Sequence, residues 1–134
     1  MTGGCHCGAV SVRVPHKPAY VNFCDCSLCA KTGGVWGYYE EHELTVLGST
    51  DCYRRNDYDE PAVEVHFCSD CGTTTHWITT EYFDGDRAGV NVRIFEPEEL
   101  HGIEARFPDG RNWFGKTTPT DRRPPGKLGV DAFL

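Results

Sequence analysis

Seven of the eight cysteines in this chain fall into three tight clusters. The clusters are the pair Cys5 and Cys7, the triplet Cys24, Cys26 and Cys29, and the pair Cys68 and Cys71. Thiolates spaced C-x-C and C-x-x-C can turn toward one tetrahedral ion, and zinc is the usual occupant of such sites. Two pairs make one closed four-sulfur site, whereas the triplet makes a second site that is one ligand short. An open position on zinc is where chemistry takes place, so the sequence predicts one structural and one reactive zinc site.

The two cysteine pairs are natural partners although they lie about sixty residues apart. Cys68, Cys71 and the glycine that follows form one half of a zinc knuckle, and Cys5 with Cys7 supplies the other half. A glycine directly follows both Cys7 and Cys71. Because glycine tolerates a positive φ, the chain can bend there and aim backbone N–H groups at a thiolate. Such a site closes a long loop, where a cross-link stabilises most.

Disulfide bonds are the alternative use of these cysteines. Eight cysteines in 134 residues is about 6%, below the roughly 8–10% typical of a disulfide scaffold. Neighbouring C-x-C residues also bridge poorly. The N-terminus carries no secretion signal, and no apolar stretch approaches the ~18 residues that span a bilayer. We therefore expect a cytoplasmic protein with reduced, metal-binding thiols and no membrane partner. Cys52 stands alone and is predicted to be a half-buried strand residue.

The charge is acidic overall but uneven. A net charge of −7 and a pI near 5.3 argue against a nucleic-acid partner. Residues 106–127 hold six basic side chains against two acidic ones, a local charge of +4. This segment is predicted either to hold a small anion or to be a solvated terminal segment.

Alternation of apolar and polar residues with period 2 predicts an all-β fold in one domain over residues 1–134. The expected strands are 10–14, 20–23, 35–39, 44–47, 52–55, 63–67, 73–80 and 90–94. Residues 96–100 resemble a short helix, with an early proline and acids in the first turn, and residues 27–31 favour a single turn. The aromatic residues of 36–39 and 76–77 are interpreted as core and rim. We expect no repeats and no linker.

The three clusters together resemble the glutathione-dependent formaldehyde-activating family. The matching stretches are residues 4–10, 23–31 and 67–72, followed by 91–93 and 107–113. The resemblance covers residues 3–113, which leaves 114–134 as a C-terminal extension, and all seven clustered cysteines match in order and spacing. Asp25 occupies the middle of the C-x-C, where many relatives carry histidine.

The resemblance implies a β-tent fold of small antiparallel sheets and two zinc ions per chain. By this resemblance Cys5, Cys7, Cys68 and Cys71 are ligands of a structural zinc, and Cys24, Cys26 and Cys29 hold the active-site zinc. The implied activity is that of a carbon–sulfur lyase, which joins glutathione to formaldehyde as S-hydroxymethylglutathione. The partners are then a small-molecule thiol and an aldehyde.

The chemistry of the triplet agrees with this implication. Only the thiolate attacks an aldehyde carbon well, and a zinc with a free position can bind a thiol and lower its pKa. Two alternatives stay open: a non-catalytic zinc-binding β domain, in which Cys52 or a histidine closes the triplet site, and a thiol-rich metal or redox sensor. His6, His66 and His76 are alternatives as a fourth ligand or proton shuttle. Asp25 and Asp70 are interpreted as solvated loop residues, with orientation of the metal ligands as the alternative.

Overall fold

The computed structural model describes residues 1–113 and 118–134. The described strands are β1 (Thr2–Gly4), β2 (Ser11–Arg13), β3 (Tyr20–Asn22), β4 (Trp36–Tyr39), β5 (Thr45–Leu47), β6 (Thr50–Arg54), β7 (Val63–Cys68), β8 (Thr74–Thr79), β9 (Ala88–Asn91), β10 (Glu104–Arg106) and β11 (Gly126–Lys127). The described helices are α1 (Ser27–Thr32) and three 3-10 helices, η1 (Glu41–Glu43), η2 (Val92–Ile94) and η3 (Pro97–Leu100). None of them has both the length and the apolar character to cross a membrane.

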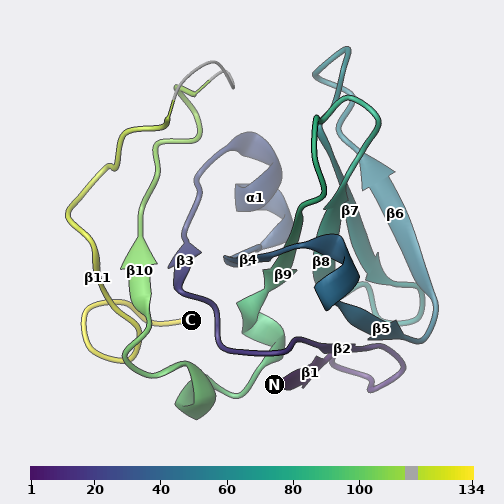
Figure 1. The fold of residues 1–134 in the computed structure, drawn as a ribbon, viewed down its shortest axis with the longest axis horizontal. Helices are drawn as coiled ribbons and strands as arrows, with labels where there is room; N and C mark the ends of the chain where they lie inside the picture. Colours follow the sequence, from purple (N-terminus) through teal and green to yellow (C-terminus); the bar gives the residue numbers. More distant parts are fainter. Residues whose placement is uncertain (114–117) are drawn as a thin grey trace.

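The strands form two sheets (Figure 1). The smaller sheet has the order β1-β2-β5, and the larger has the order β11-β10-β3-β4-β9-β8-β7-β6. All pairings are antiparallel except that of β10 with β3. The arm formed by β6, β7 and β8 and the arm formed by β10 and β11 stand on either side of α1. The mostly-β fold predicted from the sequence is thus confirmed, with one parallel pair added.

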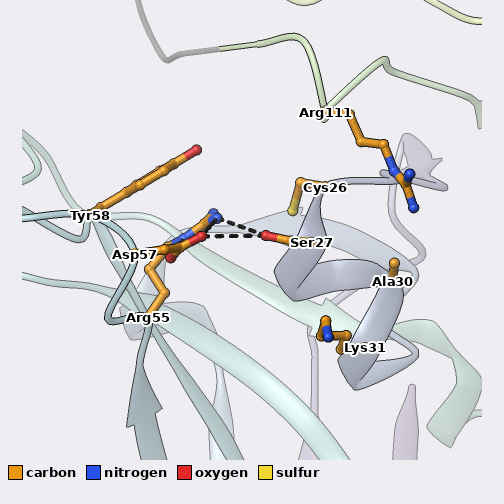
Figure 2. Close-up of a pocket in the computed structure, with 9 residues that line it drawn as sticks. Cys26, Ser27, Ala30, Lys31, Arg55, Asp57, Tyr58 and Arg111 are labelled. Carbon is orange, nitrogen blue, oxygen red and sulfur yellow. Dashed lines mark hydrogen bonds and ion pairs between the residues drawn. The ribbon is translucent and has the colours of Figure 1, made fainter.

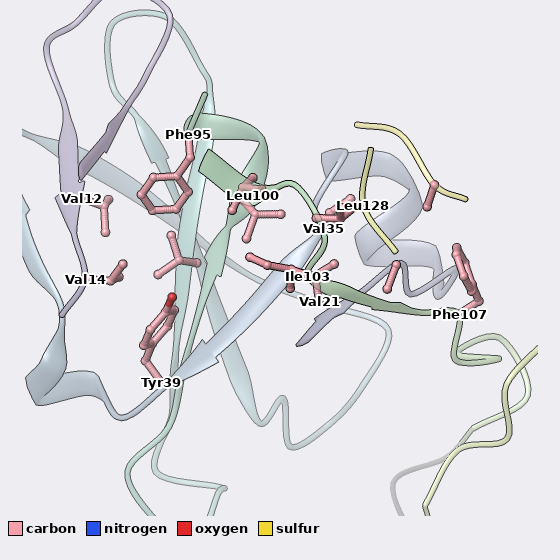
Figure 3. Packing of buried hydrophobic residues seen from close by; sticks show 14 residues of the cluster. Val12, Val14, Val21, Val35, Tyr39, Phe95, Leu100, Ile103, Phe107 and Leu128 are labelled. Atoms are coloured by element: carbon pink, nitrogen blue, oxygen red, sulfur yellow. The ribbon is translucent and has the colours of Figure 1, made fainter. Parts of the chain in front are cut away.

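The main core lies where the two sheets meet (Figure 3). Val12 of β2 and Val14, which directly follows this strand, pack in one cluster with Phe95, with Leu100 of η3 and with apolar side chains of the larger sheet. The period-2 pattern explains this arrangement, because alternate side chains of a strand point to the same face. Val12 and Leu100 are fully buried, and burying a side chain of this size contributes on the order of 2 kcal/mol.

A second core supports α1. Trp36 on β4 and Trp77 on β8 meet edge to face, with ring centroids 6.3 Å apart. Leu28 and Cys29 of α1 pack against this pair. The two tryptophans are buried, so the interpretation of these aromatics as core residues is confirmed. The helix therefore packs on the pair Trp36 and Trp77, and this contact positions Cys29.

The sequence pattern differs from the structure at several ends. The predicted strand 90–94 stops at Asn91, because the Asn91 side chain accepts the N–H of Arg93 and starts η2. The predicted turn at 27–31 is the helix α1, and the predicted helix at 96–100 is the 3-10 helix η3. The strands β1, β10 and β11 are too short for an alternation signal. Of the predicted extension 114–134, residues 114–117 lie outside the described residues.

Candidate metal centres and the cavities beside them

The two cysteine pairs meet between the sheets. Cys5 and Cys7 follow β1, while Cys68 ends β7 and Cys71 lies in the hairpin before β8. The four Sγ atoms lie within 4.8 Å of one another, with 3.6 Å between Cys5 and Cys7 and 3.7 Å between Cys7 and Cys68. Zn–S bonds of about 2.3 Å give a tetrahedron whose edge is about 3.8 Å. The donor set and its spacing therefore fit a zinc ion, and the pairing expected from the sequence is confirmed.

Backbone geometry prepares this cluster. Gly8 and Gly72, which follow Cys7 and Cys71, have φ values of 80° and 75°. These left-handed turns are the ones that favour glycine. The N–H of Val10 donates to Cys5 Sγ at 3.2 Å, which satisfies a sulfur that is otherwise buried. The positive φ predicted at both glycines is thus confirmed.

The triplet lies at the start of α1. Cys24 and Cys26 precede the helix, and Cys26 Sγ caps it by accepting the N–H of Cys29 at 3.4 Å. The three sulfurs lie within 4.8 Å of one another. Within 1–113 and 118–134, no fourth His, Cys, Asp or Glu joins this group. The indole N–H of Trp36 donates to Cys29 Sγ at 3.2 Å, and this bond orients the Cys29 side chain.

The thiols of the triplet perturb one another strongly. Contact with Cys24, and then with Cys29, lowers the pKa of Cys26, whereas contact with the other two thiols raises the pKa of Cys29. Three sulfurs this close cannot all ionise without a cation. A zinc ion would stabilise all three as thiolates, so this donor set also fits the metal.

A chain segment from the C-terminal half passes directly over the triplet. Asp25, between the first two cysteines, accepts the N–H of Gly110 at 2.8 Å and that of Arg111 at 3.3 Å through Oδ1. Its Oδ2 lies 3.4 Å from Nε of Arg122, and its side chain is only 24% exposed. The interpretation of Asp25 as a solvated loop residue is therefore wrong. Local patterns gave no signal of it, because the partners lie more than 80 positions away.

The larger cavity opens beside Cys26 (Figure 2). It has a volume of about 480 Å³. Its walls are Cys26, Ser27, Ala30, Lys31, Arg55, Asp57, Tyr58, Gly110 and Arg111. In Figure 2 the side chains of the 55–58 loop face α1 across the space, and Arg111 lies on the other side of Cys26. A concave site of this size next to three thiols suits a small-molecule ligand.

The loop wall of this cavity is held rigidly. Both nitrogens Nε and Nη2 of Arg55 donate to the Asp57 carboxylate at 2.7 Å, and Nη2 also donates to Ser27 Oγ at 3.1 Å. The guanidinium lies 3.7 Å from the ring centroid of Tyr58. Lys31 and Arg111 on the opposite wall have no carboxylate partner in the described part of the chain.

Comparison with known proteins places this geometry in a family. The family model described as "Glutathione-dependent formaldehyde-activating enzyme" matches residues 1–106. The chain belongs to this family. A Halomonas elongata protein, provisionally named a glutathione-dependent formaldehyde-activating enzyme, is 40% identical over an alignment of 88 positions, and the match covers 58% of this chain and 55% of that relative. The match thus spans about half the length of that curated protein.

A solved structure also resembles this fold. The crystal structure of a Rhodobacter sphaeroides protein aligns with a TM-score of 0.58 and 31% identity, over 72% of this chain and 88% of the other. The family match ends at residue 106, whereas the resemblance seen in the sequence extended to 113. Residues 107–113 include Gly110 and Arg111, which line the larger cavity. In this member of the glutathione-dependent formaldehyde-activating family, part of the wall of the larger cavity therefore comes from residues that lie beyond the region matched by the family model.

The remaining candidate residues lie outside both cysteine groups. His66 contacts Thr50 and Glu64 at 3.0 Å, and its ring stacks on His76 at 4.6 Å. Neither histidine joins the described cysteine groups, and His6 does not either. Cys52 lies on β6, opposite His66 in the strand register, and is exposed rather than half-buried as predicted, because β6 is the edge strand.

The basic segment 106–127 divides between several positions. Arg111 lines the larger cavity, and Arg122 lines a smaller one. Arg106 lies over the ring of Tyr20, and Arg123 over that of Phe107, so these two pack on the surface. Lys127 lies in β11, and Lys116 lies outside the described residues. Anion binding by this segment remains a prediction, now limited to Arg111 and Arg122.

Proposed function

We propose that this protein catalyses the reversible addition of a thiol to a small aldehyde at the cysteine triplet, as a zinc-dependent carbon–sulfur lyase. Glutathione and formaldehyde are the substrates that its family's name implies. The observation that carries this proposal is the triplet itself, which has three sulfurs, no fourth ligand in the described chain, and a cavity of about 480 Å³ beside Cys26. A closed structural site has neither an open position nor a cavity. The clustered free thiols of this protein suit the reducing cytoplasm, which we propose as the protein's location.

In this proposal Cys24, Cys26 and Cys29 hold a zinc ion, and Cys5, Cys7, Cys68 and Cys71 hold a structural one. When bound at the triplet, zinc would supply the positive charge that lowers the pKa of a thiol at its open position. The protein contributes the placement of the thiol substrate. Lys31 and Arg111 offer cations without carboxylate partners to its carboxylates.

The reaction balances without an oxidant or a reductant. The thiol sulfur forms a bond to the carbonyl carbon, and the carbonyl π electrons move to the oxygen. The proton released from the thiol ends on that oxygen, giving a hydroxyalkyl thioether. In the reverse direction the same C–S bond breaks, which is the lyase direction.

The test is exchange spectroscopy by NMR on mixtures of glutathione and formaldehyde. We expect the protein to speed exchange between the free thiol and the hydroxymethyl adduct. The uncatalysed reaction is already rapid, so the comparison is with the Cys26→Ser variant rather than with buffer. Cys52→Ser is the matched control, because it removes an exposed thiol outside both groups and leaves the triplet intact. Equal exchange rates for the wild type and Cys26→Ser would refute glutathione–formaldehyde chemistry at the triplet.

A further inference from the structure

The triplet borders a second cavity, on the side of Cys24 and Cys29. This cavity has a volume of about 250 Å³. Its walls are Phe23, Cys24, Asp25, Cys29, Ala30, Gly33, Gly34, Val35, Arg93 and Arg122. Cys26 does not line it, and Cys24 and Cys29 do not line the larger cavity. One water occupies about 30 Å³ in the liquid, so this second space has room for a molecule of a few heavy atoms.

The walls of the smaller cavity are preformed. Asn91 is buried, and its Oδ1 accepts the N–H of Val35 at 3.1 Å and that of Arg93 at 3.3 Å. One amide group therefore fixes the backbone of two wall residues relative to each other. Gly33, which ends α1 with a φ of 68°, and Gly34 contribute no side chain to fill the space.

Two guanidinium groups face this space against one carboxylate. Arg93 is exposed and has no hydrogen bond or ion pair from its side chain within the described residues. Arg122 uses Nε toward Asp25 and Pro108, and Nη2 toward the carbonyl of Phe23. This leaves its Nη1 without a bond to the described chain. Apart from the thiols, two cations and one anion line this cavity, in a chain whose net charge is −7.

We propose that the smaller cavity binds the carboxylate of an aldehyde substrate, and that Arg93 is the residue that determines this specificity. This inference rests on the proposed function, and it extends the substrate class from neutral aldehydes to aldehydes that carry a carboxylate beside the carbonyl. The thiol enters from the larger cavity beside Cys26, and the aldehyde from the smaller one beside Cys24 and Cys29. The planar guanidinium of Arg93 pairs with the carboxylate in a bidentate manner, with Arg122 as a second donor.

The geometry separates the two substrates in a way that favours addition. Gly110 lines the larger cavity, and Asp25, which accepts the N–H of Gly110, lines the smaller one. The two molecules therefore approach the three sulfurs from opposite sides of the 109–111 segment. With glyoxylate, the smallest aldehyde that carries a carboxylate, the thiol sulfur bonds to the aldehyde carbon and the thiol proton ends on the former carbonyl oxygen. The carboxylate takes no part in bond changes and serves only to hold the aldehyde.

The kinetic experiment compares Arg93→Gln with the wild type, using glutathione and either glyoxylate or formaldehyde. Because the carboxylate contact is present before and during addition, its loss should raise KM rather than lower kcat. We expect the ratio of KM for glyoxylate to KM for formaldehyde to rise about tenfold or more, as the loss of one charge-assisted hydrogen bond predicts, because only glyoxylate has a carboxylate to lose contact with Arg93. The matched control is Arg87→Gln, which removes an exposed guanidinium that lies 5.0 Å from the Tyr38 ring centroid and lines neither cavity.

A binding experiment keeps this inference separate from the proposed function. Acetate and its neutral analogue acetamide are titrated into the zinc-loaded protein, and the amide signals of Gly33 and Gly34 are followed by NMR. The inference requires that acetate, and not acetamide, shifts these signals in the wild type, and that Arg93→Gln abolishes the shift. Absence of an acetate shift in the wild type, or an equal shift in Arg93→Gln, would overturn it. If the wild type accelerates neither aldehyde, the proposed function fails, and the acetate shifts still decide the cavity.

Discussion

Asp25 accepts the backbone N–H of Gly110 at 2.8 Å, although 85 positions separate the two residues. Asp25 lies between two cysteines of the triplet, so the bond fastens the 109–111 segment directly to the candidate reactive site. A Cβ atom on Gly110 would lie 2.4 Å from Cys24 Sγ and 3.0 Å from Cys26 Cβ. Backbone therefore covers these two cysteines as closely as glycine allows, and Asp25 sets its position.

Replacing Asp25 with alanine should release this segment. Two backbone N–H groups and Arg122 lose an anionic acceptor, and hydrogen bonds to charged groups contribute about 1.5–3 kcal/mol. We expect a lower melting temperature and faster amide hydrogen exchange at Gly110 and Arg111. Asp25→Asn is the matched variant, because its side-chain oxygen still accepts a hydrogen bond. If exchange at Gly110 is as fast in Asp25→Asn as in Asp25→Ala, the charge rather than the acceptor holds the segment.

Replacing Gly110 with alanine should displace the same segment by a steric route. The new methyl group would overlap Cys24 Sγ, so the backbone must move away. We expect the addition activity to fall at least about tenfold, since misplacement by an ångström is costly at a reactive site. The four-cysteine site should keep its metal. Gly4→Ala is the control, because its Cβ would meet only the carbonyl of Val10 at an ordinary 3.5 Å. Unchanged activity in Gly110→Ala would show that the 109–111 segment does not shape the site.

The two cysteine groups should respond differently to a single serine. In Cys68→Ser the four-sulfur site loses a ligand, and apparent binding energies of about 10–16 kcal/mol for structural zinc are as large as the whole stability of a typical domain. We expect this variant to lose zinc and unfold. In Cys26→Ser the fold should remain, because serine is itself a good N-cap for α1. Circular dichroism and thermal melts measure the difference.

Native mass spectrometry gives the metal content of the same proteins. We expect two zinc ions in the wild type, with the triplet ion leaving first on chelation because it has one fewer protein ligand. Cys26→Ser should retain one tightly bound zinc. A wild type with one bound metal and a freely titratable triplet would contradict the two-site prediction. Unfolding of Cys26→Ser as severe as that of Cys68→Ser would make the triplet structural.

Stability should fall in mild acid because of His76. Burial, with a smaller contribution from the neighbouring His66, lowers its pKa from 6.5 to about 4. Between these values the unfolded chain binds a proton that the folded protein does not, so the free energy of unfolding decreases as the pH drops from 6.5 to 4. The full effect is about 3 kcal/mol. His76→Asn should show a shallower dependence in denaturant melts over this window, with His42→Asn, an exposed site, as the control. Parallel curves for wild type and His76→Asn would contradict this assignment.

The sequence carried much of the fold and of the metal clusters because both depend on local patterns. Strands such as β7 alternate apolar and polar residues, and the spacing of Cys24, Cys26 and Cys29 lets one turn gather three sulfurs. The glycine after Cys71 marked a left-handed turn that the structure contains. These features were readable because their causes lie within a few neighbouring residues.

The walls of the site could not be predicted because they are built from distant segments. Arg55 and Arg111 come from two different loops and Arg93 from η2, and only tertiary pairing brings them beside α1. Asp25 was misinterpreted for the same reason, since its partners are Gly110 and Arg122. The parallel pairing of β10 with β3 likewise gives no short-range signal, because its connection is long.

The 61-residue separation of Cys7 and Cys68 has a consequence for biosynthesis. Ribosomes add about 5–20 residues per second, so the N-terminal pair emerges roughly 3–12 s before its partners. During that interval Cys5 and Cys7 form only half of the metal site, and their thiols are open to oxidants and to competing metals. The supply of zinc to the nascent chain, rather than the stability of the finished domain, would then decide how much protein reaches its mature state.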